Sequence, residues 1–383
     1  MSAHDPPSPG RRELHPAVRL IVFVALLFLF LVAIKLMGDS IKALGENTAS
    51  GLFDGVSNPF AGLAVGILAT VLVQSSSVTT STIVAMVGSG TMPIATAVPM
   101  IMGANIGTTV TNTLASLGYL RRSSEFRRAF AGATMHDFFN IMAVAVLLPL
   151  ELATGFLSKA AAALAGLLGK STDLKFESPD SPIKAAVKAP VKLFENIVEG
   201  LGAHNTVLSI LLFILGLALI FVALAYITRN MKLVVAGRIE RSMNVVLAKG
   251  GGITAMAIGL IMTVAVQSSS ITTSVLVPMI AAGVLTLANA YPITLGANVG
   301  TTVTALLASL ATDRPEGLVI ALVHTLFNIS GILLFYPIPQ LRRIPLYLAG
   351  KLAAVAEVRK SLVIVYVIGA FVLVPLLGIL ILQ

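Results

Sequence analysis

Long apolar runs alternate with short polar stretches along most of the chain. The runs approach the roughly 20 residues that a helix needs to cross a bilayer. They cover 19–38, 134–150, 205–228, 318–338 and 361–382. Two further stretches, 153–170 and 346–357, are amphipathic and predict helices that lie in the membrane interface. The pattern predicts an all-α integral membrane protein.

Clusters of hydroxyl and amide side chains interrupt this apolar background. The first cluster, VQSSSVTTS, spans 73–81, and the flanking segments 61–73 and 77–90 are each too short to cross a membrane. A re-entrant hairpin, in which two half-helices meet inside the membrane, accounts for this pattern. Irregular backbone at that depth is tolerated only within protein or along a water-filled cavity. We therefore expect the cluster to face the interior of the protein.

The chain is an internal duplication. The segment 74–90 matches 267–283 at 10 of 17 positions, and 103–117 (GANIGTTVTNTLASL) matches 296–310 (GANVGTTVTALLASL) at 12 of 15. Both pairs are offset by 193 residues, and HDFFNI pairs with HTLFNI at an offset of 188. Each half therefore predicts one re-entrant hairpin and one transmembrane helix interrupted at its GAN-x-GTT motif.

Loop charges predict that the two halves have opposite orientations. The loop 121–128 carries four arginines and one acid, whereas its counterpart 312–317 carries one arginine and two acids. Conversely, 228–241 is basic and its counterpart around 38–54 is nearly neutral. Because basic loops stay in the cytoplasm, equivalent loops fall on opposite sides, which predicts two repeats of inverted topology.

This orientation gives an order of domains. It predicts a cytoplasmic N-terminal tail (1–18), a first membrane repeat (19–170), an extracytoplasmic linker (171–199), a second membrane repeat (200–360) and a C-terminal transmembrane helix (361–383). The polar linker is too short to form a soluble domain, so we expect no extramembrane enzyme or receptor head.

Composition supports this class. Of 383 residues 56% are hydrophobic and 11% are charged, against about 25% charged residues in a soluble domain. The absence of cysteine excludes disulfides and cysteine-ligated metals. The net charge of +9 comes mostly from short loops, so we interpret it as a topology signal and not as a nucleic-acid site.

The polar clusters have the chemistry of an anion site. A helix that starts after Gln74 or Ser75 leaves its first N–H groups unpaired, and the positive end of its dipole attracts an anion. Two such tips facing each other would hold a small oxyanion from both sides, with the motif asparagines positioning them. The candidate substrate-binding residues are Gln74, Ser75, Ser76, Ser77, Asn105, Gln267, Ser268, Ser269, Ser270 and Asn298.

Almost no lysine or arginine lies in the apolar segments, so a bound anion there would need co-bound cations. Threonine hydroxyls and unwound carbonyls suit a hard cation such as sodium. Asp137 is the one acid well inside an apolar segment, and its repeat equivalent is Thr325. The candidate metal-binding residues are Thr108, Thr111, Asp137, Asn140, Gln267, Ser268, Thr301 and Thr304.

Structural interpretations compete with each of these. Serine clusters and glycines in membrane helices often serve only close helix packing. His136 and His324 fit buried structural hydrogen-bond donors better than proton carriers. Asp137 could be a buried hydrogen-bond acceptor that holds no ion.

Together, the paired QSSS motifs, GANIGTTVTNT, EFRRAFAGATMHDFFN and LLPLELATG resemble the type II sodium–phosphate cotransporters over about 25–340. The resemblance implies sodium-driven phosphate symport by alternating access, with substrate contacts at Gln74–Ser77 and Gln267–Ser270 and sodium-site threonines at Thr301 and Thr304. It implies no cofactor beyond the co-transported sodium ions, and no enzymatic activity. The short, cysteine-free linker favours a bacterial protein of the cytoplasmic membrane.

The same resemblance bears on stoichiometry. Ala131, Ala133 and Asp137 match the electrogenic class of the family, which implies three sodium ions for each divalent phosphate. Two alternatives remain open from the residues alone. One is a sodium symporter of another small anion, such as sulfate, arsenate or a dicarboxylate, and the other is a membrane phosphate sensor that does not transport.

Overall fold

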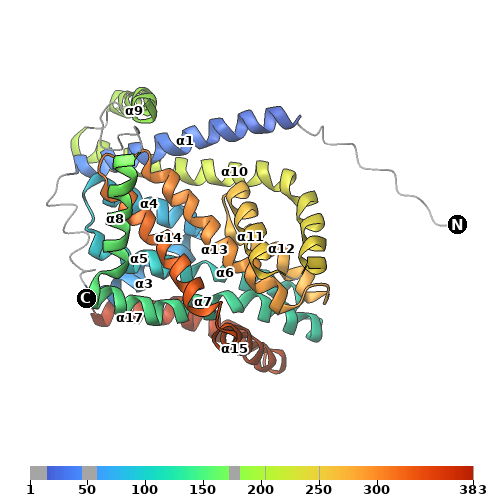
Figure 1. Cartoon of the computed structure of the whole chain (residues 1–383). Helices are drawn as coiled ribbons and strands as arrows, with labels where there is room; N and C mark the ends of the chain where they lie inside the picture. The colour runs from blue at the N-terminus through green and yellow to red at the C-terminus, as the bar shows by residue number, and fades with distance from the viewer. Residues whose placement is uncertain (1–14, 45–57, 172–181, 203, 250, 383) are drawn as a thin grey trace.

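The computed structural model describes residues 15–44, 58–171, 182–202, 204–249 and 251–382, and these ranges are helical apart from short connections (Figure 1). The predicted all-α class is therefore confirmed. The first half contains α1 (Pro16–Ala43), α3 (Pro59–Val73), α4 (Ser76–Ser89), α5 (Ile94–Gly107), α6 (Thr109–Ser116), the 3₁₀ turn η2 (Leu117–Tyr119), α7 (Ser123–Thr154) and α8 (Phe156–Ser171). The helix α9 (Pro182–Gly200) follows.

The second half repeats this order. It contains α10 (Asn205–Lys249), α11 (Gly252–Val266), α12 (Ser269–Ala281), α13 (Leu287–Ser309), α14 (Glu316–Phe335) and α15 (Pro339–Val358). The C-terminal segment has no counterpart in the first half and consists of α16 (Ser361–Ile368), the π-helical turn η3 (Gly369–Leu373) and α17 (Val374–Leu382).

Six helical segments in the described ranges are long and apolar enough to cross a membrane. They are Ala17–Ala43, Ile94–Tyr119, Ser123–Thr154, Thr206–Met231, Glu316–Phe335 and Ser361–Leu382. Five overlap the runs predicted from the sequence, and the sixth, Ile94–Tyr119, carries the first GAN-x-GTT motif. The predicted amphipathic helices correspond to α8 and α15.

Each QSSS motif forms the turn of a tight helical hairpin. The turn between α3 and α4 is Gln74–Ser75, and the turn between α11 and α12 is Gln267–Ser268. The arms have 13 to 15 residues, fewer than a membrane-spanning helix needs. Both glutamines adopt left-handed backbone angles, with φ of 56° and 55°, and no other non-glycine residue in the described ranges has a positive φ. Left-handed backbone is costly for such a residue, so both turns are held by their surroundings.

The two halves pack with exchanged partners. The helix α1 runs beside its equivalent α10 along one edge of the molecule (Figure 1). The helix α4 packs against α13, as α12 packs against α6, and α8 packs against α14, as α15 packs against α7. The core of the molecule is therefore built between the halves and not within each half.

The expected interruption at the GAN-x-GTT motif is present only in the first half. There, helix α5 ends at Gly107 and α6 begins at Thr109, whereas α13 runs unbroken through its motif. The expectation of an interruption in the second half is wrong. The difference follows the side chains, because the Thr109 hydroxyl bonds His136 of α7, whereas the equivalent Thr302 hydroxyl bonds the carbonyl of Val299 in its own helix.

Equivalent glycines bring each hairpin against the motif helix of its own half. A Cβ atom on Gly103 would lie 2.0 Å from the Leu63 carbonyl oxygen, and one on Gly296 would lie 1.9 Å from the Met256 carbonyl oxygen. Only hydrogen fits at these crossings. The glycines therefore fix how closely α3 approaches α5 and α11 approaches α13.

Part of the predicted domain order lies outside the described residues. This holds for 1–14 of the N-terminal tail, 45–57 of the first loop and 172–181 of the linker. The domain boundaries and the sides of the membrane remain predictions.

Gly296→Ala tests the close crossing of α11 and α13. The added methyl group forces the helices apart, and overpacking of this kind costs about 1–3 kcal/mol. We expect a lower unfolding temperature in detergent, measured by thermal denaturation of the purified protein. Gly350→Ala is the matched control, because a Cβ there meets nothing within 4 Å. Equal unfolding temperatures for the two variants would refute the packing argument.

Candidate functional site

The two QSSS turns meet inside the molecule. The Ser77 hydroxyl donates to the backbone carbonyl of Gln267 over 3.4 Å, which joins the tip of one hairpin to the tip of the other. Ser76, Ser77 and Ser269 are only 6%, 5% and 4% exposed, and Ser270 is half-buried. The sequence analysis required both serine clusters to face the interior and lie close together, and the structure places them so.

Both turn glutamines hold their hairpins by the same two hydrogen bonds. The Gln74 amide Nε2 donates to the Val71 carbonyl, and its Oε1 accepts from the Thr111 hydroxyl at 3.1 Å. In the second half, Gln267 repeats this arrangement with the Val264 carbonyl and the Thr304 hydroxyl, the latter at 2.9 Å. Each glutamine thus supplies a partner to an unpaired carbonyl at its helix end, and it joins that end to the motif helix.

The N-termini of α4 and α12 converge on this junction. Ser75 and Ser268 are the N-cap residues, and their hydroxyls accept from the third N–H of each helix, those of Val78 and Ile271. The N–H groups of the first two residues have no acceptor within the helix. These are Ser76 and Ser77 in α4, and Ser269 and Ser270 in α12. Four backbone donors and two helix dipoles therefore meet where the tips touch.

The motif asparagines connect the halves instead of contacting the tips. The Asn298 side-chain oxygen accepts from His136 Nε2, and its amide donates to Asn140 Oδ1 at 3.1 Å. Asn140 in turn donates to the backbone carbonyl of Asn105 at 3.1 Å. The network runs from α13 to α7 and on to α5.

The equivalent asparagine of the first half makes the reciprocal contacts. The Asn105 side-chain oxygen accepts from His324 Nε2 and from the Asn328 amide, each at 3.3 Å. Asn105, Asn298 and both histidines are buried. The histidines are therefore bonded donors within a polar network, which agrees with the structural interpretation that the sequence favoured.

The four motif threonines divide into two pairs. Thr108 and Thr301 donate their hydroxyls to carbonyls of their own helices, Ala104 and Ala297. The hydroxyls of Thr111 and Thr304 donate instead to the turn glutamines. All four offer oxygen lone pairs beside the junction, which is the ligand chemistry that a hard cation prefers.

Asp137 is fully buried beside this network. Its Oδ2 accepts from the Tyr366 hydroxyl of α16 at 2.7 Å, and its Oδ1 has no hydrogen-bond partner. No lysine or arginine forms an ion pair with it in the part of the chain that the structure describes. Buried charges are normally paired or metal-bound, so this carboxylate has room for a cation.

Sequence reasoning missed one polar contact at the site. The Asn112 amide donates to the Thr273 hydroxyl at 2.7 Å, and its carbonyl accepts from the Ser274 hydroxyl at 3.1 Å, which ties α6 to α12. The repeat equivalent of Asn112 is Ala305, and Ser81, the equivalent of Ser274, has a buried hydroxyl without a partner. The signal was a mismatch inside the otherwise matching GAN-x-GTTVT segments.

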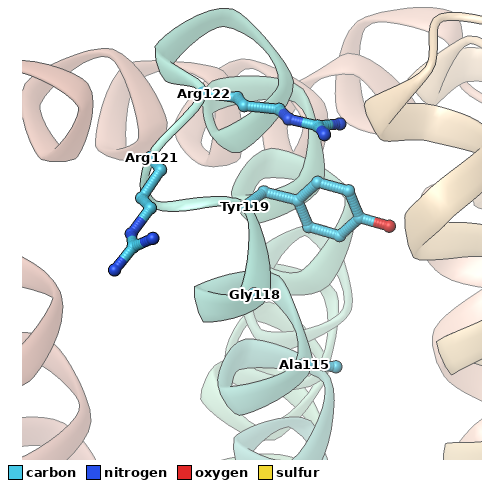
Figure 2. A pocket seen from close by; sticks show the side chains of 5 residues that line it. All are labelled: Ala115, Gly118, Tyr119, Arg121 and Arg122. Atoms are coloured by element: carbon cyan, nitrogen blue, oxygen red, sulfur yellow. The ribbon is translucent and has the colours of Figure 1, made fainter.

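One face of α6 opens to solvent. Leu114 is 45% exposed, and Ala115 and Gly118 line an open cavity of about 560 Å³ together with Tyr119, Arg121 and Arg122. Figure 2 shows Tyr119 and Arg122 extending to the same side of the chain, with Arg121 on the other.

The corresponding face of α13 is closed. Ala308 and Ala311, the equivalents of Ala115 and Gly118, are both 0% exposed. Beyond them, the Arg314 backbone N–H donates to the Gly88 carbonyl at 3.1 Å, and Lys35 bonds Asp313 at 2.9 Å. The two ends of the pseudo-symmetric site therefore differ in access.

Comparison with known proteins gives concordant matches. The family model described as Na+/Pi-cotransporter matches residues 29–168 and 212–342. The chain is 34% identical to sodium-dependent phosphate transport protein 2A of Ovis aries, over 96% of this chain and 69% of that protein. It is also 34% identical to sodium-dependent phosphate transport protein 2B of Homo sapiens, over 94% of this chain and 64% of that protein. No solved structure matches the chain.

Thr304→Val tests the bond that holds the second turn. The change leaves the Gln267 side-chain oxygen without its donor, and a buried unsatisfied group costs about 1–3 kcal/mol. Thr301→Val is the control, since that hydroxyl bonds only its own helix. In sodium-free, phosphate-free buffer we expect Thr304→Val to lower the unfolding temperature more than Thr301→Val. Equal losses would mean that the turn does not depend on this bond.

Proposed function

The chain belongs to the Na+/Pi-cotransporter family, and from that premise we propose that it is a sodium-coupled symporter of inorganic phosphate that works by alternating access. Members of this family are transporters and not enzymes, and the six candidate spans agree with a multi-pass membrane protein. One observation carries the proposal, the contact between Ser77 and Gln267 at the meeting of two buried QSSS turns. Close packing explains small side chains there, but it does not require two converging helix N-termini.

We further propose that the halves are inverted repeats and that both hairpins are re-entrant, in a bacterial cytoplasmic membrane. The exchanged contacts of equivalent helices support a pseudo-twofold relation. The opposite charges of equivalent loops support its placement in the membrane plane. The short arms of each hairpin are consistent with entry to mid-depth and return to the same side.

Phosphate binds between the tips in this proposal. The N–H groups and hydroxyls of Ser76, Ser77, Ser269 and Ser270 are donors suited to its oxygens. Gln74, Gln267, Ser75 and Ser268 shape the two turns. Asn105 and Asn298 act one layer away by holding the motif helices of both halves in register.

Sodium binds beside the second turn. Gln267 is 4% exposed whereas Gln74 is exposed, so the second turn is the better place for a cation that has lost most of its water. Oxygens from Ser268, Thr301, Thr304 and the Gln267 side chain supply one set of ligands. A second set, comprising Thr108, Thr111, Asp137 and Asn140, lies in the first half.

The described conformation corresponds to an inward-open carrier. The cavity at Arg121 and Arg122 lies on the side that loop charges assign to the cytoplasm. The buried faces of Ala308 and Ala311, with the Lys35–Asp313 contact, close the other side. The two arginines attract a released or returning anion electrostatically.

The buried carboxylate supports electrogenic transport. Asp137 adds one negative charge to the two of divalent phosphate, so three sodium ions neutralise the loaded site. Carrying an unneutralised charge through a low-dielectric core is costly. Each cycle then moves one net positive charge inward, and a membrane potential of 100 mV contributes about 2.3 kcal/mol to uptake.

Transport by purified protein in liposomes tests the function. An inward sodium gradient should drive accumulation of labelled phosphate, and replacing sodium with potassium should abolish it. Sulfate, arsenate and dicarboxylates serve as competitors to define the anion. Uptake that is equal in potassium refutes symport, and calorimetric binding of phosphate without flux identifies a sensor instead.

Asp137→Gly tests the charge balance. We expect the variant to transport phosphate with sodium but without net current, because two sodium ions then suffice. Tyr366→Phe is the matched control, since it removes the 2.7 Å hydrogen bond but keeps the carboxylate. The measurement is current per phosphate in voltage-clamped or potential-jumped vesicles. An unchanged ratio in Asp137→Gly would remove Asp137 from the coupling mechanism.

A further inference from the structure

An open polar cavity of about 340 Å³ lies apart from the hairpin tips. It is formed where α11 and α13 begin, where α14 ends and along α15. The residues that matter here are Gly252, Asn289, Tyr291, Tyr336, Arg342 and Arg343. Loop charges place this end of the molecule on the cytoplasmic side, next to the amphipathic helix α15.

Two arginines give the cavity a positive charge. The Arg342 guanidinium lies over the Tyr336 ring, 5.1 Å from its centroid, and this contact fixes its direction. Arg343 is exposed on the next position of α15. Neither forms an ion pair with a carboxylate among the residues that the structure describes. Both charges are therefore available to an anion.

A buried hydroxyl in the cavity wall has no partner. Tyr291 is 1% exposed and its ring lies 6.2 Å from that of Tyr336, yet its hydroxyl makes no hydrogen bond. Buried tyrosine hydroxyls almost always have a partner, because leaving one unmet is costly. An acceptor bound in the cavity would supply it.

The start of α11 adds backbone donors. Its N-cap is Gly251, which provides no side-chain hydrogen bond, so the first N–H groups remain open. A Cβ on Gly252 would lie 1.9 Å from the Tyr336 hydroxyl oxygen, so this tyrosine sits directly over the helix start. Arginines, tyrosine hydroxyls and a helix N-terminus together form a set of donors for an anion.

The duplicated transport machinery does not explain this cavity. At the repeat offsets of 193 and 188, the equivalents of Tyr291 and Tyr336 are Val98 and Leu148, both buried and apolar. The equivalent of Arg342 is Thr154. The tips, glutamines, asparagines and histidines all occur twice, whereas this donor set occurs only in the second half.

We propose that this cavity is a second binding site for a phosphate group, either that of an anionic phospholipid headgroup or free phosphate from the cytoplasm. The site does not depend on the proposed transport function, because none of its residues contributes to the tips. Its position beside α15 suits a headgroup at the cytoplasmic leaflet, where basic pockets between helices hold anionic lipids.

Ligand titrations of the purified full chain, in detergent and sodium-free potassium buffer, test the site. The probes are dihexanoylphosphatidylglycerol, zwitterionic dihexanoylphosphatidylcholine and inorganic phosphate, followed by thermal shift and by native mass spectrometry. The comparison is between wild type and the double variant Arg342→Gln with Arg343→Gln. Lys351→Gln with Arg359→Gln removes the same charge from the same region, outside the cavity, and is the control.

We expect the arginine variant to weaken the probe that occupies the site by at least tenfold and the control by less than threefold. Loss confined to phosphatidylglycerol identifies a headgroup site, and loss confined to inorganic phosphate identifies a free-phosphate site. Equal effects of the two double variants, or no binding that distinguishes them from wild type, overturn the proposal.

Tyr291→Phe separates ligand binding from a structural role. Removing an unpartnered hydroxyl should leave the unfolding temperature of the ligand-free protein unchanged or raised. The same change should weaken binding of the probe about five- to tenfold, since a hydrogen bond to a charged group is lost. A lower unfolding temperature with unchanged binding would show that the hydroxyl serves the fold and would overturn its place in the site.

Discussion

A helix that ends inside an apolar protein leaves carbonyl and N–H groups that water cannot reach, and the architecture depends on how those groups are satisfied. Gln74 and Gln267 meet this requirement by taking left-handed backbone angles, bonding back to their own helices and accepting hydroxyls from Thr111 and Thr304. The carbonyl ends of α3 and α11 are thereby supplied with partners from the protein. The N–H ends of α4 and α12 are left for something else, and this imbalance creates the site.

Neither half completes its own polar interior. Asn105 of the first half finds its side-chain partners in His324 and Asn328, and Asn298 of the second half finds His136 and Asn140. A separated half would bury several of these groups without partners, at a cost of about 1–3 kcal/mol for each. The duplicated sequence is therefore one cooperative unit, and the shared site can form only when both halves are folded together.

The sequence predicted the features that repeat or that follow a simple period. Apolar length located five of the six candidate spans, and duplication identified the serine turns and placed them together. The partners of Asp137 were beyond such reasoning, because Tyr366 lies on a C-terminal helix without a repeat equivalent and no spacing relates the two. The unbroken α13 was missed for a related reason, since the matching motif at α5–α6 is interrupted where cross-helix bonds of Thr109 act on it.

Asn112 shows that the two halves are not mechanically equivalent. Its amide ties α12 to α6 through Thr273 and Ser274, whereas Ala305 offers α4 nothing, and the Ser81 hydroxyl stays unbonded. Sliding α12 along its neighbour at this depth would break two side-chain bonds, but sliding α4 along α13 would break none there. The pseudo-symmetric pair therefore contains one anchored arm and one arm with a smoother path, so the two directions of a conformational cycle need not meet the same barrier.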